Sequence, residues 1–111
     1  MNKLFPSPIR KLPRADIPLN GVIAFLAQGK KHQIVFSEYT QNAEIPVHSH
    51  ATQWGVVLEG KIKFTINGKT LTYGKGDIFH IPAGVKHSSK VFAKYADIQF
   101  FNEKKRFRTR R

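Results

Sequence analysis

The sequence predicts an all-β domain. Nine short apolar or β-branched runs are separated by breaks rich in Gly, Asn, Pro or Lys, and none shows convincing helical periodicity. Short strands at a spacing of about 8–12 residues favour a sandwich or a barrel, and the pattern alone does not choose between the two. A chain of 111 residues has room for one compact domain with a single core.

The expected strands are residues 22–27, 32–39, 44–50, 54–58, 61–66, 69–73, 77–81, 90–93 and 95–101. The run at 61–66 alternates most cleanly, with three apolar side chains on one face and three polar ones on the other. Asn67-Gly68 then predicts a type I′ turn into residues 69–73, because both central positions of that turn need a positive φ.

The net charge of +12 is concentrated at the two ends of the chain, which hold ten of its nineteen basic residues. Residues 15–103 carry nine basic and seven acidic side chains, which is ordinary for a soluble domain. We therefore divide the chain into an N-terminal arm or strand (1–20), a barrel domain (21–103) and a basic C-terminal tail (104–111). A solvated tail is the usual interpretation of such a charge run, and a nucleic-acid-associated regulator acting through the basic ends is an outside alternative.

The residue types that are missing exclude several kinds of chemistry. The chain has no cysteine, so disulfides, thiolate zinc sites and thiol nucleophiles are excluded. It has neither the apolar stretch of a signal peptide nor a run of membrane-spanning length. We expect a soluble, cytoplasmic protein with no membrane partner.

Two short motifs carry most of the functional information. HSHATQ at 48–53 and PAGVKH at 82–87 supply the imidazoles of His48, His50 and His87 and the amide of Gln53, enough donors to hold a metal ion. If residues 44–50 form a strand, His48 and His50 point to the same face. Gln53 has the wrong parity for that face, so residues 51–52 must form a tight turn or bulge, and Gln53 must enter from the next strand.

The longer segments HSHATQWGVVLEG and GDIFHIPAGVKH resemble the two signature motifs of the cupin superfamily. The resemblance implies a small jelly-roll β-barrel of the RmlC-like kind, with a metal inside near one mouth, and a homodimer. Most cupins have Glu where Gln53 stands, and Val91 replaces an Asn that often follows the second motif. The alternative is a degenerate barrel that has lost its metal and keeps hydrogen-bonded or solvated histidines.

A neutral amide at position 53 leaves the +2 charge of a metal uncompensated, which favours a small-molecule anion as the ligand. Three imidazoles and one oxygen suit Fe, Ni, Zn, Mn or Cu, and the sequence does not rank them. Gly84 in the Pro-x-Gly turn is expected to adopt a positive φ and to aim His87 at the site.

Three aromatic residues are candidates for the pocket wall: Trp54, Phe64 and Phe79. Phe79 and His80 have opposite parity, so only one of them can face inward, and the resemblance favours Phe79. His80 is then a packed or exposed histidine.

Two functional classes follow. The first is a metal-dependent enzyme, an oxygenase or isomerase acting on a carboxylate or enol-bearing metabolite. The second is a noncatalytic module that binds or senses a small molecule in the same pocket. The catalytic residues are unknown, because none of the acid and base candidates in the sequence is compelling: Glu38, Tyr39, Glu44 and Glu59.

Overall fold

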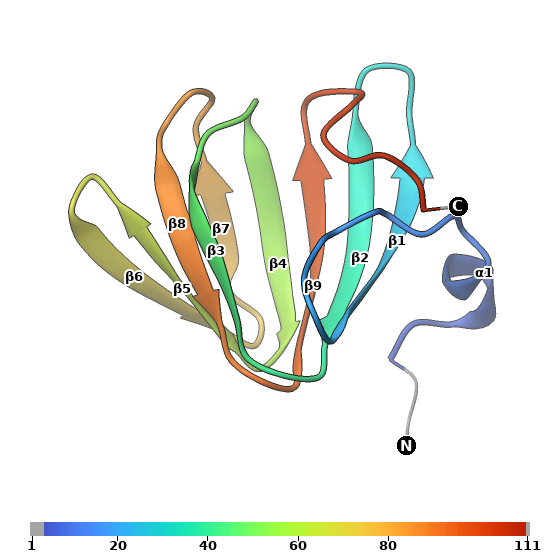
Figure 1. Ribbon diagram of the computed structural model, residues 1–111, viewed down its shortest axis with the longest axis horizontal. Coiled ribbons are helices and arrows are strands. Elements are labelled where there is room, and N and C mark those ends of the chain that lie inside the picture. The colour runs from blue at the N-terminus through green and yellow to red at the C-terminus, as the bar shows by residue number, and fades with distance from the viewer. Residues whose placement is uncertain (1–3, 111) are drawn as a thin grey trace.

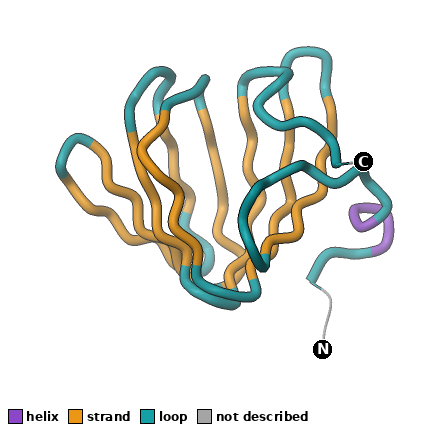
Figure 2. Tube along the Cα trace, in the orientation of Figure 1, coloured by secondary structure: helices purple, strands orange, loops and turns teal. Residues whose placement is uncertain are grey.

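The computed structural model describes residues 4–110, which contain nine strands and one four-residue helix (Figures 1 and 2). In chain order the elements are α1 (Ser7–Arg10), β1 (Val22–Gln28), β2 (Gln33–Tyr39), β3 (Ala43–His48), β4 (Gln53–Glu59), β5 (Lys61–Ile66), β6 (Lys69–Gly74), β7 (Ile78–Ile81), β8 (His87–Val91) and β9 (Tyr95–Phe101). Within this part of the chain, no helix has the length and apolar character needed to cross a membrane.

The strands form two antiparallel sheets that face each other, with orders β1-β2-β9-β4-β7 and β3-β8-β5-β6. Consecutive strands β3 and β4 lie in different sheets, as do β8 and β9, so the chain repeatedly crosses between the layers (Figure 1). This arrangement confirms the predicted all-β jelly-roll barrel.

The main core lies between the sheets because the strands alternate between inward and outward side chains. In β2, for example, every second residue from Gln33 to Tyr39 is buried. The inward set forms one apolar cluster: Tyr39, Ala43, Val57, Ile62, Phe64, Phe79, Ile81, Val91 and Tyr95. Several of these side chains also line the cavity that contains the candidate site.

The predicted strands are all present, and the differences lie at their ends. β3 ends at His48 instead of residue 50, and β8 begins at His87 instead of residue 90. The helix α1 was not expected; it is a single turn that follows Pro6. Asn67 and Gly68 have φ values of 51° and 75°, as the predicted type I′ turn requires.

The two terminal segments complete the barrel next to β1 and β2. The backbone of Asp16 donates to the carbonyl of Arg108 at 2.7 Å, and that of Arg110 donates to Arg14 at 2.6 Å. Phe107 packs against a second apolar cluster: Ala15, Ala24, Leu26, Val35 and Phe101. The C-terminal segment is therefore attached to the barrel through its backbone and through Phe107, whereas the side chains of residues 108–110 are exposed.

Candidate metal centre

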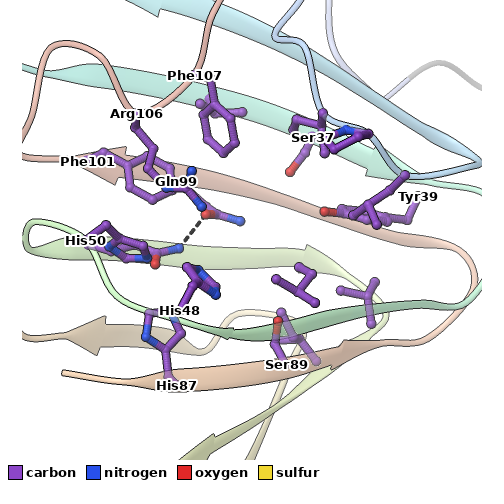
Figure 3. A pocket seen from close by; sticks show the side chains of 18 of the residues that line it. Ser37, Tyr39, His48, His50, His87, Ser89, Gln99, Phe101, Arg106 and Phe107 are labelled. Atoms are coloured by element: carbon purple, nitrogen blue, oxygen red, sulfur yellow. Dashed lines mark hydrogen bonds between the residues drawn. The ribbon is translucent and has the colours of Figure 1, made fainter. Parts of the chain in front are cut away.

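Three histidines meet at the open end of the barrel (Figure 3). His48 lies at the end of β3, His50 in the connection that follows, and His87 at the start of β8. One ring nitrogen from each lies within 4.8 Å of the other two. The sequence placed His48 and His50 on one strand face, but only His48 is in the strand, and the connection brings the His50 imidazole to the cluster.

The hydrogen bonds of the rings show which nitrogens are free to bind a metal. In each ring Nδ1 contacts a backbone carbonyl: His48 that of Pro46 at 2.8 Å, His50 that of Ala51 at 2.7 Å, and His87 that of Val85 at 3.0 Å. A carbonyl only accepts, so each Nδ1 carries a proton, and in the neutral form of each ring Nε2 presents a lone pair.

The Nε2 atom of His50 is buried and has no hydrogen-bond partner within the described chain. A buried imidazole nitrogen without a partner costs free energy unless something occupies the position in front of it. The residues therefore fit a metal ion held by three Nε2 atoms, with backbone carbonyls fixing the orientation of each ring.

The protonation states of His50 and His87 suit metal binding. Burial is the main cause that lowers the pKa of His50 from 6.5 to about 4; the hydrogen bond to Ala51 opposes the shift, and nearby Arg106, His87 and His48 add to it. Burial also lowers the pKa of His87. At neutral pH both imidazoles are neutral, which is the form that binds metals.

Three contacts hold the connection between β3 and β4 in place. The N–H of Gly84 donates to the carbonyl of His50 at 2.9 Å, and the N–H of Asn102 donates to that of Thr52 at 2.9 Å. The carboxylate of Glu103 accepts from the N–H of Ala51 at 3.1 Å. The segment that carries His50 is thus fixed to the second motif and to the end of β9.

Gln53 is the first residue of β4, 5% exposed, and its side chain lines the same cavity as the three histidines. Residues 51–52 are not part of a strand, which agrees with the turn that the parity argument requires. The Gln53 amide nitrogen donates to Oε1 of Gln99 on β9. Because the nitrogen is engaged there, the oxygen of Gln53 is free for another partner.

Behind Gln99 lies Asp97, a carboxylate that the sequence analysis missed. It is 0% exposed and accepts hydrogen bonds from the hydroxyl of Ser37, the hydroxyl of Tyr95 at 2.6 Å and the amide of Gln99 at 2.6 Å. Burial raises the pKa of Asp97 to about 6, and these three hydrogen bonds oppose the increase. Burial and Asp97 together raise the pKa of Tyr95.

Arg106 also lines the cavity, which the sequence analysis did not foresee. Its guanidinium lies over the rings of Phe107 at 4.4 Å and Phe101 at 5.6 Å. Figure 3 shows it on the same side of the cavity as Gln99 and Phe101, opposite His87. Its Nε is buried without a hydrogen-bond partner in the described chain, and burial lowers the pKa of the guanidinium, which still remains charged.

The three aromatic pocket candidates have different locations. Phe64 lines the cavity, whereas Phe79 is buried behind it and packs on Phe64 with ring centroids 4.9 Å apart. Trp54 is 48% exposed on the outer face of β4 and stacks on His80 at 4.0 Å. Trp54 therefore does not wall the cavity, because it has the opposite strand parity from Gln53.

The acid and base candidates from the sequence lie away from the histidines, except for one tyrosine. Glu38 pairs with Arg10 at 3.3 Å, Glu59 pairs with Lys75 at 3.3 Å, and Glu44 is exposed. Tyr39 lines the cavity, and burial raises the pKa of its hydroxyl.

The cavity has a volume of about 420 Å³, enough for a small metabolite. Apolar side chains such as Val35, Ile62, Phe64 and Val91 form much of its wall. The polar groups that line it include the histidines, Gln53, Gln99, Arg106, Arg108 and Asp16. Residues 16–19 and 106–108 also line the cavity. The two terminal segments are therefore part of the site.

Comparison with known families adds a decisive observation: residues 35–91, just over half of the chain, match the cupin domain model. The chain belongs to the cupin family. This match includes both motifs and all four of the proposed metal ligands. No curated protein matches the sequence of this cupin.

Several solved structures share the fold. An RmlC-like cupin from Shewanella frigidimarina superposes with a TM-score of 0.75 at 21% identity, covering 95% of each chain. KdgF from Halomonas sp. gives a TM-score of 0.72 at 20% identity, covering 87% of this chain and 92% of its own. A variant oxalate decarboxylase of Bacillus subtilis gives 0.70 at 17% identity, covering 86% of this chain and 28% of its own. At these identities the similarity shows the fold alone.

Proposed function

We propose that this cupin binds one divalent transition metal through His48, His50, His87 and Gln53, and uses it to bind and transform a small anionic metabolite. The observation that carries the proposal is the convergence of three imidazole lone pairs in a cavity that also contains the Arg106 guanidinium. The donor set suits Fe, Ni, Zn, Mn or Cu. A similar structure, the oxalate decarboxylase of Bacillus subtilis, is described as having Mn(II) centres.

The charges around the cavity favour an anion. An imidazole that binds a metal through its lone pair is neutral, as is the Gln53 amide, so an ion held by these four ligands keeps its +2 charge, and Arg106 adds another positive charge. Among the described residues that line the cavity, Asp16 is the sole carboxylate, and it is exposed. Asp97 offsets part of the charge, but it is covered by its hydrogen-bond donors and is not accessible to a ligand.

Each part of the site has a chemical task. The metal, when bound, supplies a Lewis acid or a redox centre next to the ligand. Arg106 pairs with a carboxylate and sets its orientation, since a guanidinium offers several donors in one plane. The apolar wall around Phe64 limits water and strengthens these electrostatic contacts.

A noncatalytic binding or sensing module is the second candidate, and one observation favours it. The two tyrosines among the described cavity residues are unsuited to proton transfer at neutral pH, because burial raises the pKa of both Tyr39 and Tyr95. An enzyme built on this site would depend on the metal for its chemistry. The cytoplasmic location and the homodimer remain predictions, and light scattering of the purified protein tests the homodimer.

The proposal is tested by titrating pyruvate, a small carboxylate, into metal-free and Mn²⁺-loaded protein in a calorimeter. We expect binding to the loaded form, weak or no binding to the metal-free form, and a loss of roughly tenfold or more with Arg106→Gln. Arg110→Gln is the matched control, because Arg110 is exposed in the same segment and does not line this cavity. Equal binding with and without metal would contradict a metal-centred anion site.

A further inference from the structure

The side-chain amide of Gln53 can present either its oxygen or its NH₂ group to the histidine cluster. Only the oxygen can bind a cation, so something must fix the amide in one of two orientations. The local geometry near the histidines does not do this, because the described contact of the Gln53 side chain is to Gln99 on the neighbouring strand. The orientation is therefore set from the Gln99 side.

Gln53 and Gln99 can touch because of the strand register. Gln53 of β4 pairs with Phe101 of β9, and Gly55 pairs with Gln99, so the two glutamines are diagonal neighbours on the inner face. Asp97 lies two residues before Gln99 on the same face and directly opposite Ser37 of β2. These positions produce a continuous row of hydrogen bonds from Ser37 through Asp97 and Gln99 to Gln53.

We infer that Asp97 is a positioning residue for the metal centre: its carboxylate fixes the direction of the Asp97–Gln99–Gln53 hydrogen-bond chain, so that Gln53 presents its oxygen. The inference rests on the proposed metal site. An ionised carboxylate only accepts hydrogen bonds, so the NH₂ group of Gln99 must face Asp97, as the 2.6 Å contact shows. The Gln99 oxygen then faces Gln53 and accepts from its NH₂ group.

The same chain explains why position 53 holds glutamine and not the glutamate of most cupins. A glutamate at this position would also be an acceptor, and Gln99 has one NH₂ group to share between two carboxylates that lie on opposite sides of it. Either the new carboxylate would face the Gln99 oxygen, or Asp97 would. Each arrangement places two acceptors against one another in a buried site, which is unfavourable.

Substitutions of Asp97 and Gln53, at the two ends of this hydrogen-bond chain, should therefore have coupled effects on metal affinity. Asp97→Asn allows the chain to reverse, because the new amide can donate to the Gln99 oxygen; Gln99 then donates to Gln53, whose NH₂ group turns toward the metal. We expect this variant to bind Mn²⁺ roughly tenfold or more weakly, as is typical when an outer partner of a ligand is lost. In the reversed chain, a glutamate in place of Gln53 would have its donor.

The test is a double-mutant cycle on Mn²⁺ affinity, measured by calorimetry with wild type, Asp97→Asn, Gln53→Glu and the double variant. We expect Gln53→Glu to bind Mn²⁺ more tightly in the Asp97→Asn background than in the wild-type background, by roughly tenfold or more. Ser37→Ala is the control, because Ser37 contacts the other oxygen of Asp97 and not Gln99. Equal effects of Gln53→Glu in the two backgrounds would overturn the inference.

A second readout needs no metal. In ¹⁵N-labelled metal-free protein, the side-chain NH₂ signals of both Gln53 and Gln99 should shift in Asp97→Asn, and that of Gln53 should lose protection from exchange because its NH₂ group no longer donates to Gln99. Circular dichroism checks that the variant is folded. A Gln53 signal that does not respond to Asp97→Asn would refute the chain. If wild type bound no metal while the NMR signals responded as expected, the proposed function would fail and the positioning by Asp97 would stand.

Discussion

The backbone N–H of Gly84 donates to the carbonyl of His50 at 2.9 Å, and this bond joins the two motifs that carry the histidines. The Pro-x-Gly turn thereby determines more than the position of His87, because it also holds the irregular segment after β3. Gly84 has a φ of 76°, a backbone conformation that is unfavourable for residues other than glycine. The turn therefore contributes to the placement of both His50 and His87 in the histidine cluster.

Gly84→Ala should lower the free energy of unfolding by about 1–2 kcal/mol, because a Cβ is strained at positive φ. It should also weaken metal binding, since relief of the strain moves the backbone that holds His50 and His87. Gly68→Ala is a close control: Gly68 has a φ of 75°, and a Cβ at either position meets no atom within 4 Å. Urea denaturation should show a similar decrease in the free energy of unfolding for Gly84→Ala and Gly68→Ala. Unchanged metal affinity in Gly84→Ala would contradict this role of the turn.

Asp97 should contribute more to the stability of the metal-free protein in mild acid than at neutral pH. Its pKa is about 6 in the folded protein and 3.8 when exposed, so the folded state binds more protons between these values. Its contribution to stability is therefore fully present below pH 4 and falls as pH rises to about 6, by on the order of 3 kcal/mol. Urea denaturation at several pH values should show this slope in wild type relative to Asp97→Asn. A constant difference between the two would contradict it.

His50 should have the opposite effect on stability. Its pKa is lowered from 6.5 to about 4 on folding, so the unfolded chain binds more protons between these values. The stability that His50 contributes is present above about pH 6.5 and is lost as pH falls toward 4. An NMR titration of the imidazole in metal-free protein measures this pKa directly. A midpoint at the ordinary value of 6.5 would show that the ring is not desolvated.

Phe107→Ala should release the C-terminal segment while leaving the histidines in place. Phe107 packs on Phe101, and its backbone exchanges two hydrogen bonds of 2.9 Å with the buried side chain of Gln33. We expect a loss of about 1–3 kcal/mol in stability, less than for a fully buried phenylalanine. Pyruvate affinity should fall, because Arg106 loses its support, with metal stoichiometry unchanged.

Thr109→Ala is the control for Phe107→Ala, since Thr109 lies in the same segment with an exposed side chain. It should keep both stability and pyruvate affinity. If Phe107→Ala bound pyruvate as tightly as wild type, the C-terminal segment would have no part in the site.

The elements that local patterns encode were predictable from the sequence. Alternating apolar residues predicted the strands, and Asn67-Gly68 predicted its turn, because these signals depend on residues close together in the chain. The parity of Gln53 also predicted a break after the histidines. The two histidine motifs were visible because their candidate donors have fixed short spacings.

Two parts of the site depend on contacts between distant residues. Arg106 reaches the cavity because Phe107 finds an apolar surface on β1, β2 and β9, and no local pattern reveals that surface. Asp97 was predictable in principle: it shares strand parity with Tyr95, Gln99 and Phe101 in β9, and inward-facing polar residues beside aromatic ones are unusual. Its partners Ser37 and Gln53 come from other strands, so its role required the sheet order.

The central claim is that the three histidines and Gln53 hold one metal ion, and elemental analysis of protein purified without added metal tests it most directly. We predict about one transition-metal ion per chain in wild type, a loss in both His87→Ala and Gln53→Ala, and retention in His80→Ala, whose imidazole stacks on Trp54 outside the cavity. Wild-type protein that contains no metal, and takes up none from excess Mn²⁺, Zn²⁺, Ni²⁺, Fe²⁺ or Cu²⁺, would contradict the claim.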